Sequence, residues 1–263
     1  MLKNASIKFI FKTALLMLST MGILVVISSL TGAIATPNLL SSLSSPTYPS
    51  FGVTLPADFE VHGIDVSRHQ QNIDWEAVSK MKHNDVSISF VYIKASEGKT
   101  ISDNYFKQNW RAVKDNGMLR GAYHFYRPHL TAEVQANLFF SQLPKLEKGD
   151  LPPVLDIEIK GNTPVSTMRK GLKKWLVMVE KKYGVTPIIY TNYSFHKNYL
   201  NTPEFKKYPL WIAHYKTPNL YHKMSNWHFW QHTDRANVNG IRGGVDFNVY
   251  KGSLDELKTL CKK

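Results

Sequence analysis

The stretch Pro153–Gly161, "PVLDIEIKG", places two acidic side chains inside an apolar segment. Its apolar residues, most of them β-branched, predict a buried strand. Asp156 and Glu158 lie two positions apart, and side chains at that spacing point to the same face of a strand. Because an unpaired buried charge costs free energy, this pair indicates a chemical role rather than a structural one.

This strand belongs to a series of alternating strands and helices. The pattern predicts strands at 61–67, 88–96, 119–128, 152–159 and 186–192, separated by helices at 73–82, 104–117, 131–143 and 165–184. Three further strands, at 208–215, 226–233 and 243–251, follow with little helix between them, and a helix closes the chain. Alternating strands and helices imply a parallel sheet, so we expect a compact, barrel-like α/β domain.

In such a barrel the active groups lie at the C-terminal ends of the strands. Polar residues gather at those positions and are expected to converge at one mouth: Asp65, Glu97, Tyr123, His124, Tyr126, Asp156, Glu158, Tyr190, Asn192, Trp211, His214, Gln231, His232, Asp246 and Asn248. Acids at an aromatic-lined mouth suit hydrolysis of a glycosidic bond, which needs a proton donor and an anion beside an oxocarbenium-like transition state. Crowded carboxylates repel each other, so one of them is expected to keep its proton.

Several of these residues also have ordinary explanations. A single aspartate at a strand end, such as Asp65 or Asp246, is commonly a turn or cap residue. Trp211 and Trp230 suit either the core or a platform for a sugar ring. The ten histidines show no metal-ligand spacing, so no metal site is expected.

The N-terminal region carries the pattern of an export signal in residues 1–35. Lys3, Lys8 and Lys12 precede an apolar run at 14–30, and the following "AIA" resembles a signal-peptidase site. An uncleaved signal anchor is the alternative, because the apolar run approaches the roughly 20 residues of a spanning helix. Both alternatives predict an exported protein.

Three regions are therefore predicted: a signal peptide or anchor at 1–35, a Ser/Pro-rich linker at 36–58, and one domain at 59–263. The single cysteine, Cys261, excludes a disulfide within the chain. The formal net charge is +13, and removal of the three lysines of the signal leaves 30 basic and 20 acidic residues. A basic exported protein tends to accumulate on anionic polymers. The chain has no recognisable nucleic-acid-binding motif, so no nucleic-acid partner is expected.

Eight segments, in this order along the chain, resemble glycoside hydrolase family 25, the Chalaropsis-type lysozymes or N-acetylmuramidases. They are "GIDVSRHQQNIDW", "FVYIKASEG", "GAYHFYRP", "PVLDIE", "PIIYTN", "LWIAHY", "FWQHTD" and "GGVDFNVYKG", and together they extend over 61–252. The resemblance implies an irregular TIM-like (β/α)5(β)3 barrel. It also implies cleavage of the β-1,4 bond between N-acetylmuramic acid and N-acetylglucosamine in peptidoglycan.

The resemblance also implies roles for individual residues. Glu158 would be the general acid, Asp156 would support the substrate's 2-acetamido group, and Asp65 and Asp246 would complete the acidic cluster. The substrate-binding candidates are Tyr123, Tyr190, Trp211, Gln231, Tyr126 and Glu97. No cofactor is implied, and the expected protein is a monomer in the periplasm, the cell envelope or the medium, with membrane contact only through an uncleaved anchor. A non-catalytic glycan-binding barrel is the alternative, and the carboxylate spacing leaves retaining and inverting outcomes open.

Overall fold

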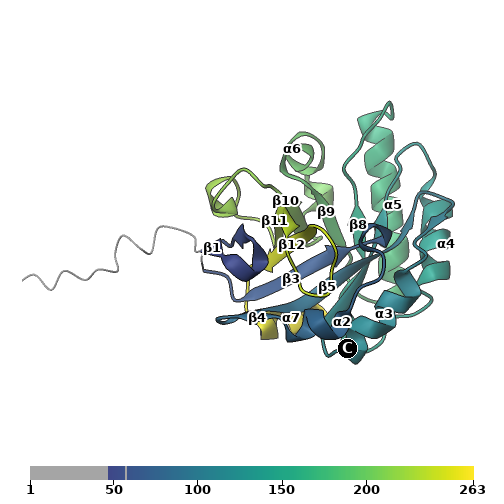
Figure 1. The fold of residues 1–263 in the computed structure, drawn as a ribbon. Helices are drawn as coiled ribbons and strands as arrows, with labels where there is room; N and C mark the ends of the chain where they lie inside the picture. Colours follow the sequence, from purple (N-terminus) through teal and green to yellow (C-terminus); the bar gives the residue numbers. More distant parts are fainter. Residues whose placement is uncertain (1–46, 57) are drawn as a thin grey trace, which may run out of the picture. The chain divides into compact units, whose positions relative to one another are not determined.

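The computed structural model describes residues 47–56 and 58–263 (Figure 1). The predicted signal and most of the predicted linker lie outside these residues. The end of the predicted linker, however, belongs to the folded domain. There β1 (Thr47–Tyr48) and β2 (Val53–Thr54) form an antiparallel pair, and the intervening Phe51 is buried against Phe247, with ring centroids 5.1 Å apart. The predicted linker boundary therefore lies too far toward the C-terminus.

Eight strands close into a barrel, each hydrogen-bonded to two neighbours. They are β3 (Val61–Val66), β5 (Val86–Glu97), β7 (Leu119–Phe125), β8 (Val154–Asp156), β9 (Ile188–Asn192), β10 (Leu210–Ala213), β11 (Phe229–Ala236) and β12 (Val245–Tyr250). Two short strands, β4 (Lys82–His83) and β6 (Ile101–Ser102), pair with β5 outside this ring. The predicted irregular α/β barrel is confirmed.

Strand direction departs from the parallel sheet that the alternation predicts. Six neighbouring pairs of the ring are parallel, from β3–β5 through to β10–β11. β12 is antiparallel to both β11 and β3. The reason is that no helix intervenes to return the chain to the starting edge, so β12 runs back along β11. As a result, the amino end of β12, with Asp246, lies at the mouth beside the carboxyl end of β3.

Helices cover the outside of the parallel part of the barrel (Figure 1). They are α2 (Trp75–Lys80), α3 (Phe106–Asp115), α4 (Ala132–Gln142) and α5 (Val165–Tyr183), all close to the predicted bounds. The sequence pattern did not predict α6 (Tyr193–Phe195) and the π-helical turn η4 (His196–Leu200), which follow β9. Short 3-10 turns complete the connections: η2 (Pro49–Phe51), η3 (Arg68–Gln70), η5 (Pro203–Phe205) and η6 (Leu220–His222).

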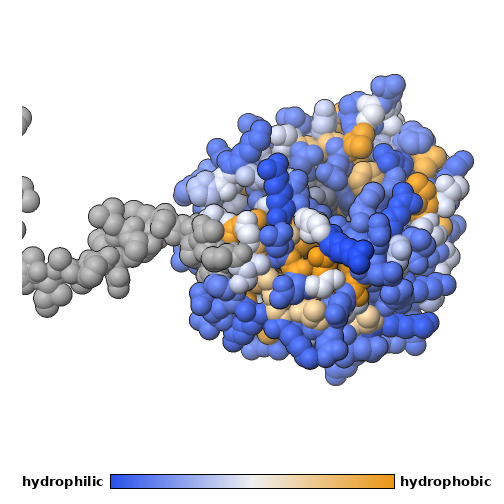
Figure 2. Space-filling model, viewed as in Figure 1, coloured by the Kyte–Doolittle hydropathy of each residue, from blue (hydrophilic) through white to orange (hydrophobic). Residues whose placement is uncertain are grey.

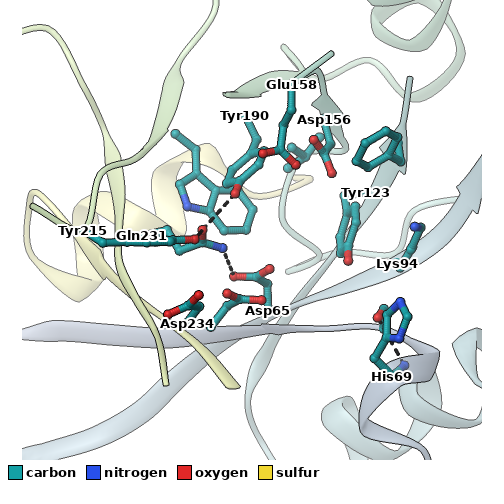
Figure 3. Close-up of a pocket in the computed structure, with 15 residues that line it drawn as sticks. Asp65, His69, Lys94, Tyr123, Asp156, Glu158, Tyr190, Tyr215, Gln231 and Asp234 are labelled. Atoms are coloured by element: carbon teal, nitrogen blue, oxygen red, sulfur yellow. Dashed lines mark hydrogen bonds between the residues drawn. The ribbon is translucent and has the colours of Figure 1, made fainter. Parts of the chain in front are cut away.

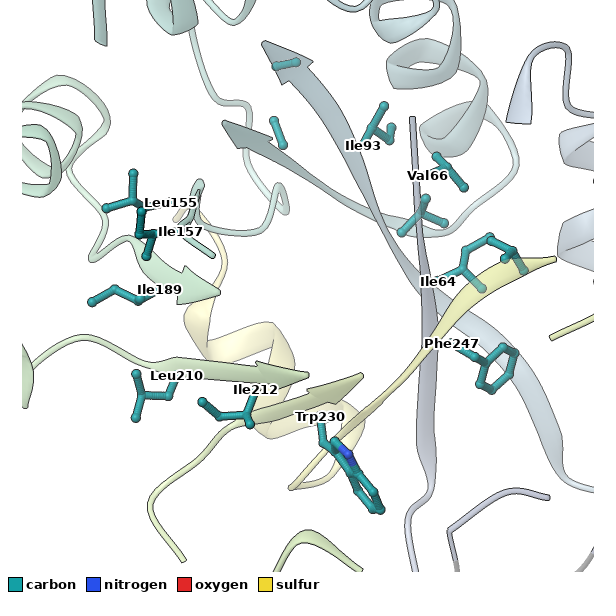
Figure 4. Close-up of a cluster of buried hydrophobic side chains, with 14 of the residues drawn as sticks. Ile64, Val66, Ile93, Leu155, Ile157, Ile189, Leu210, Ile212, Trp230 and Phe247 are labelled. Carbon is teal, nitrogen blue, oxygen red and sulfur yellow. The ribbon is translucent and has the colours of Figure 1, made fainter. Parts of the chain in front are cut away.

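Side chains alternate between two apolar layers along each barrel strand. Ile64, Ile93, Leu155, Ile189 and Ile212 point outward and are buried against the surrounding helices and loops (Figure 4). Trp230 belongs to this outer layer, so it is a core residue rather than a sugar platform.

The alternate positions fill the inside of the barrel. Phe90, Tyr92, Trp211 and Phe229 pack there at full burial, and α7 (Leu254–Leu260) with Cys261 covers the end opposite the mouth. Gly121 makes room for this packing, because a Cβ atom there would lie 2.1 Å from the Tyr92 ring. Large interior side chains thus close the lower barrel and leave polar residues to line the mouth.

The visible face of the domain is mainly hydrophilic, with hydrophobic residues in small patches (Figure 2). Over the described part of the chain, no helix has both the length and the apolar character needed to cross a membrane.

Candidate active site

A cavity of about 320 Å³ opens at the mouth of the barrel (Figure 3). Every barrel strand supplies at least one side chain to it, and the polar members come mostly from inward-pointing positions at the mouth. The lining residues are Asp65, Ser67, His69, Lys94, Tyr123, Phe125, Val154, Asp156, Glu158, Tyr190, Trp211, Tyr215, Gln231, Asp234 and Asp246. All four predicted acidic residues therefore lie at one cavity.

Asp156 and Glu158 lie on one side of this cavity, but only Asp156 is in a strand. β8 ends at Asp156, which is shorter than the predicted strand, and the chain continues with a hydrogen bond from the Ile157 amide to the Tyr190 carbonyl, 3.0 Å long. Asp156 is 5% exposed, and its Oδ1 atom has no hydrogen-bond partner among the described residues. This buried carboxyl oxygen therefore remains available to a substrate.

Burial raises the pKa of both carboxyl groups. The pKa of Asp156 lies well above its usual range because of burial and the neighbouring Glu158. Burial also raises the pKa of Glu158, an effect that Lys94 and a hydrogen bond with Asp156 partly offset. Both shifts favour the protonated form, and because the two groups interact, the proton belongs to the pair rather than to one residue.

Asp65 lies across the cavity and is held by two side-chain amides. Its Oδ2 atom accepts hydrogen bonds from Gln231 Nε2 at 2.9 Å and from Asn248 Nδ2 at 2.8 Å. Tyr190 and Tyr215 donate their hydroxyl groups to Gln231 Oε1, at 2.8 and 2.5 Å, which fixes the orientation of the amide (Figure 3). Burial raises the pKa of Asp65 to about 6, although the hydrogen bonds from the two amides act to lower it.

Asp246 faces Asp65 across the antiparallel pairing of β12 and β3, where the two residues are in register. Burial, together with the nearby Asp65, Asp234 and Glu158, raises the pKa of Asp246 to about 9. The raised pKa of Asp246 favours its protonated form, which can donate a hydrogen bond. The exposed Asp234, which the sequence did not single out, adds negative charge at the rim.

Lys94 is the cation that faces the acidic cavity. Its Nζ atom forms an ion pair with Glu97 Oε2 at 2.7 Å, and Glu97 also bonds to the guanidinium group of Arg127. The Lys94 and Arg127 cations lie over the Phe125 ring, 5.1 and 4.6 Å from its centroid. Lys94 is thus held in place from two sides while its charge acts on Asp156 and Glu158.

Aromatic side chains form the remaining walls. Trp211 is buried, its indole N–H donates to Asn248 Oδ1 at 2.8 Å, and its ring lies 4.8 Å from that of Tyr190. Tyr215 stands at the rim with 47% of its surface exposed. An exposed ring beside buried carboxyl groups is suited to stacking on a sugar ring.

Two predicted substrate-binding residues do not line the cavity. Tyr126 lies beyond the end of β7, and its ring packs in the outer layer with its hydroxyl group beside Gly171 of α5. Glu97 bonds to Lys94 and Arg127 instead of facing the cavity. Two other residues expected at the mouth, His124 and His232, point into the outer layer, because each follows an inward-pointing residue by one position.

Conversely, several lining residues were missed. Ser67 and His69 follow β3, Phe125 ends β7, and Tyr215 follows β10, so the rule of strand ends covers each of them in principle. Lys94 lies within β5, and only the alternation of side chains could have identified it. Among the described residues, no group of three potential ligands could hold a metal ion.

Comparisons with known proteins agree on one family. The family model "Glycosyl hydrolases family 25" matches residues 64–241. The uncharacterized protein YegX of Escherichia coli (strain K12) is 46% identical over 209 residues, which make up 80% of this chain and 76% of that protein. Lysozyme M1 of Streptomyces globisporus is 33% identical, over 78% of this chain and 73% of its own length.

Solved structures agree with these sequence comparisons. A family 25 glycosyl hydrolase from Bacillus anthracis superposes with a TM-score of 0.70 at 30% identity, covering 82% of this chain and all of that one. The likeness thus includes the whole barrel as well as its individual motifs.

Proposed function

Because the chain belongs to glycosyl hydrolase family 25 and is a glycoside hydrolase, we propose that it is an exported N-acetylmuramidase with Glu158 as the general acid. Its substrate would be the β-1,4 bond between N-acetylmuramic acid and N-acetylglucosamine in peptidoglycan. The observation that carries the proposal is the Asp156–Glu158 pair at the acidic cavity. Glu158 is the less buried of the two, so its proton is the more accessible to a leaving oxygen.

Asp156 would support participation of the substrate's own acetamido group. The acetamido oxygen attacks the anomeric carbon as the glycosidic bond breaks, and the leaving oxygen takes the proton of Glu158. The positive charge that develops on the acetamido group favours the ionised form of the neighbouring Asp156, so the shared proton lies on Glu158 before it passes to the leaving oxygen. Water next attacks the anomeric carbon and breaks its bond to the acetamido oxygen, while the Glu158 carboxylate takes a proton from the water, so the β configuration is retained.

Asp65 and Asp246 would bind and orient the sugar from the opposite wall. Asp65 is fixed by Gln231 and Asn248 and offers a carboxylate, while the neutral Asp246 offers a hydrogen-bond donor. Tyr123, Tyr190, Trp211 and Tyr215 would contact the apolar faces and edges of the sugars. A substrate in the periplasm or cell wall requires export, for which the predicted signal at 1–35 is suited.

The test is digestion of defined peptidoglycan followed by mass spectrometry of the released muropeptides. The proposal expects N-acetylmuramic acid at the reducing end. A reducing-end glucosamine or an anhydro product would assign the chain a different bond or reaction. Proton NMR during the first turnovers should find the β anomer first, and a first-formed α anomer would exclude acetamido participation.

A further inference from the structure

A second cavity, of about 370 Å³, lies beside the active site between the loops that follow β9 and β10. We call it the flanking pocket; its polar lining includes His196, Lys197, Asn201, Lys223 and Asn226. No acidic residue of the described chain lines it, whereas five acidic residues line the active-site cavity. Two adjacent cavities therefore present opposite charge.

A thin wall separates the two cavities. Tyr193 lines the flanking pocket, and its ring lies 5.2 Å from that of His214. The His214 amide donates to the Gln231 carbonyl at 3.0 Å, and the next residue, Tyr215, lines the active site. Tyr193, His214 and Tyr215 thus form a continuous layer between the two cavities.

Three basic side chains of the flanking pocket have no polar partner within the described chain. His196 is 8% exposed, and neither its ring nor the ammonium groups of Lys197 and Lys223 form a hydrogen bond or ion pair there. A buried polar side chain normally has a partner. His196 also begins the π-helical turn η4, and π-helical turns are frequent at functional sites. Lys197 and Lys223 are exposed, so their unpaired ammonium groups are accessible to an anionic ligand beside the largely buried His196.

We propose that the flanking pocket binds carboxylate groups of the stem peptide attached to muramic acid. The inference rests on the proposed muramidase function, since it assumes a glycan strand across the mouth. Lys197 and Lys223 would pair with the carboxylates, and His196 and Asn201 would hydrogen-bond to the peptide. The acidic cavity would then hold the uncharged sugars while the basic cavity holds the anionic branch of the same substrate.

The test compares three soluble glycan substrates that carry no phosphate polymers: one with intact stem peptides, one with amidated stem carboxyl groups, and one without stems. The variant is Lys197→Gln with Lys223→Gln. The matched control is Lys148→Gln with Lys181→Gln, which removes the same charge from two exposed lysines at the opposite end of the barrel.

The wild type should have its lowest KM on the intact stems. Because two exposed charge pairs are lost, the pocket variant should raise that KM roughly fivefold with kcat unchanged. On the other two substrates the pocket variant should equal the wild type, and the control should equal it on all three. Equal KM values for the wild type on the three substrates would overturn the inference.

Two other outcomes distinguish failure of the proposed function from failure of the inference about the flanking pocket. If the wild type releases no reducing ends from any of the three substrates, the proposed function itself fails. A fourth measurement uses whole walls that carry phosphate polymers. If the pocket variant differs from the wild type only on these walls, polymer phosphate and not the stem carboxylate is the ligand, and the inference is wrong.

Discussion

Two pairs of carboxyl groups face each other across the cavity, and their surroundings differ. Asp65 is anchored by two amides that are themselves held by Tyr190, Tyr215 and Trp211. Asp156 has an oxygen with no partner among the described residues, and Glu158 follows it beyond the end of the strand. Asp65 therefore has an oxygen satisfied by two protein amides, whereas Asp156 has an oxygen that is not satisfied by the described residues.

Under the proposed function, this difference distinguishes a carboxylate that holds the substrate from a carboxyl pair that reacts with it. A carboxylate that accepts two fixed amide donors keeps its position through a reaction, which suits binding and orientation. A buried pair with an unsatisfied oxygen and a shared proton suits proton transfer. The antiparallel strand β12 makes the first pair possible, since it brings Asp246 into register with Asp65.

The largest expected effect tests the reactive pair. Glu158→Gln keeps the size of the side chain but removes the proton donor, so the rate of reducing-end release should fall by roughly 10³-fold, within the range of a lost general acid. KM should change little. The control is Glu76→Gln on the exposed face of α2. A Glu158→Gln enzyme with more than a tenth of the wild-type rate would remove Glu158 from the acid role.

The fold was largely predictable from local patterns, and the exceptions have physical reasons. Alternation of apolar residues located all eight barrel strands, because each buries one face in the outer layer. The reversed direction of β12 could not be predicted from the apolar pattern, because a strand buries the same alternating residues whichever way it runs. The early end of β8 at Asp156 was not predicted either. Ile157 and Glu158 continue the sequence pattern of a strand beyond the last residue that pairs with β9.

Site residues were predictable where the position of a single residue along its strand was enough to identify it. Asp65, Asp156, Glu158 and Asp246 were found at strand ends. Lys94 was not predicted because it lies within β5 and not at its end. Glu97 was predicted to contact the substrate because it ends the strand, but it forms an ion pair with Lys94. Tyr126 follows the inward-pointing Phe125 by one position, so its side chain points into the outer layer and not into the cavity.

A smaller effect should appear at the anchored pair, in activity and stability together. In Asp65→Asn the amide oxygen can still accept the two hydrogen bonds, but the charge is lost, so activity should fall roughly 10- to 100-fold, less than expected for Glu158→Gln. The pKa of Asp65 is about 6 in the folded protein and 3.8 in a model peptide. The folded state thus binds the Asp65 proton more tightly than the unfolded state does. The free energy of unfolding therefore falls as the pH rises from about 4 to about 6.

Removing that carboxyl group should therefore raise the free energy of unfolding at pH 7, by at most about 3 kcal/mol. The gain should shrink between pH 6 and pH 4 and be absent at pH 3.5, where Asp65 is protonated in both states. Urea unfolding at the two pH values measures it, with the exposed Asp85→Asn as the control. A loss of stability at pH 7 would show that the carboxylate stabilises the barrel and that the binding role does not explain its burial.

The smallest expected effect concerns Lys94, the cation beside the reactive pair. Lys94→Met keeps an apolar side chain against the Phe125 ring and removes the charge that lowers the pKa of Asp156 and Glu158. Without this charge both pKa values rise. Activity is lost at high pH when the general acid loses its proton, and at low pH when its partner gains one, so both limbs of the pH profile should move to higher pH.

The rate at the variant's own optimum should stay within roughly tenfold of the wild type, because Lys94 acts through the carboxyl groups and not on the sugar. Initial rates between pH 4 and pH 9 measure the shift, and Lys99→Met, an exposed lysine just after β5, is the control. A large loss of rate at every pH, with the limbs unmoved, would mean that Lys94 contacts the substrate directly. It would also mean that the reactive pair holds its proton through burial alone, with no contribution from the neighbouring cation.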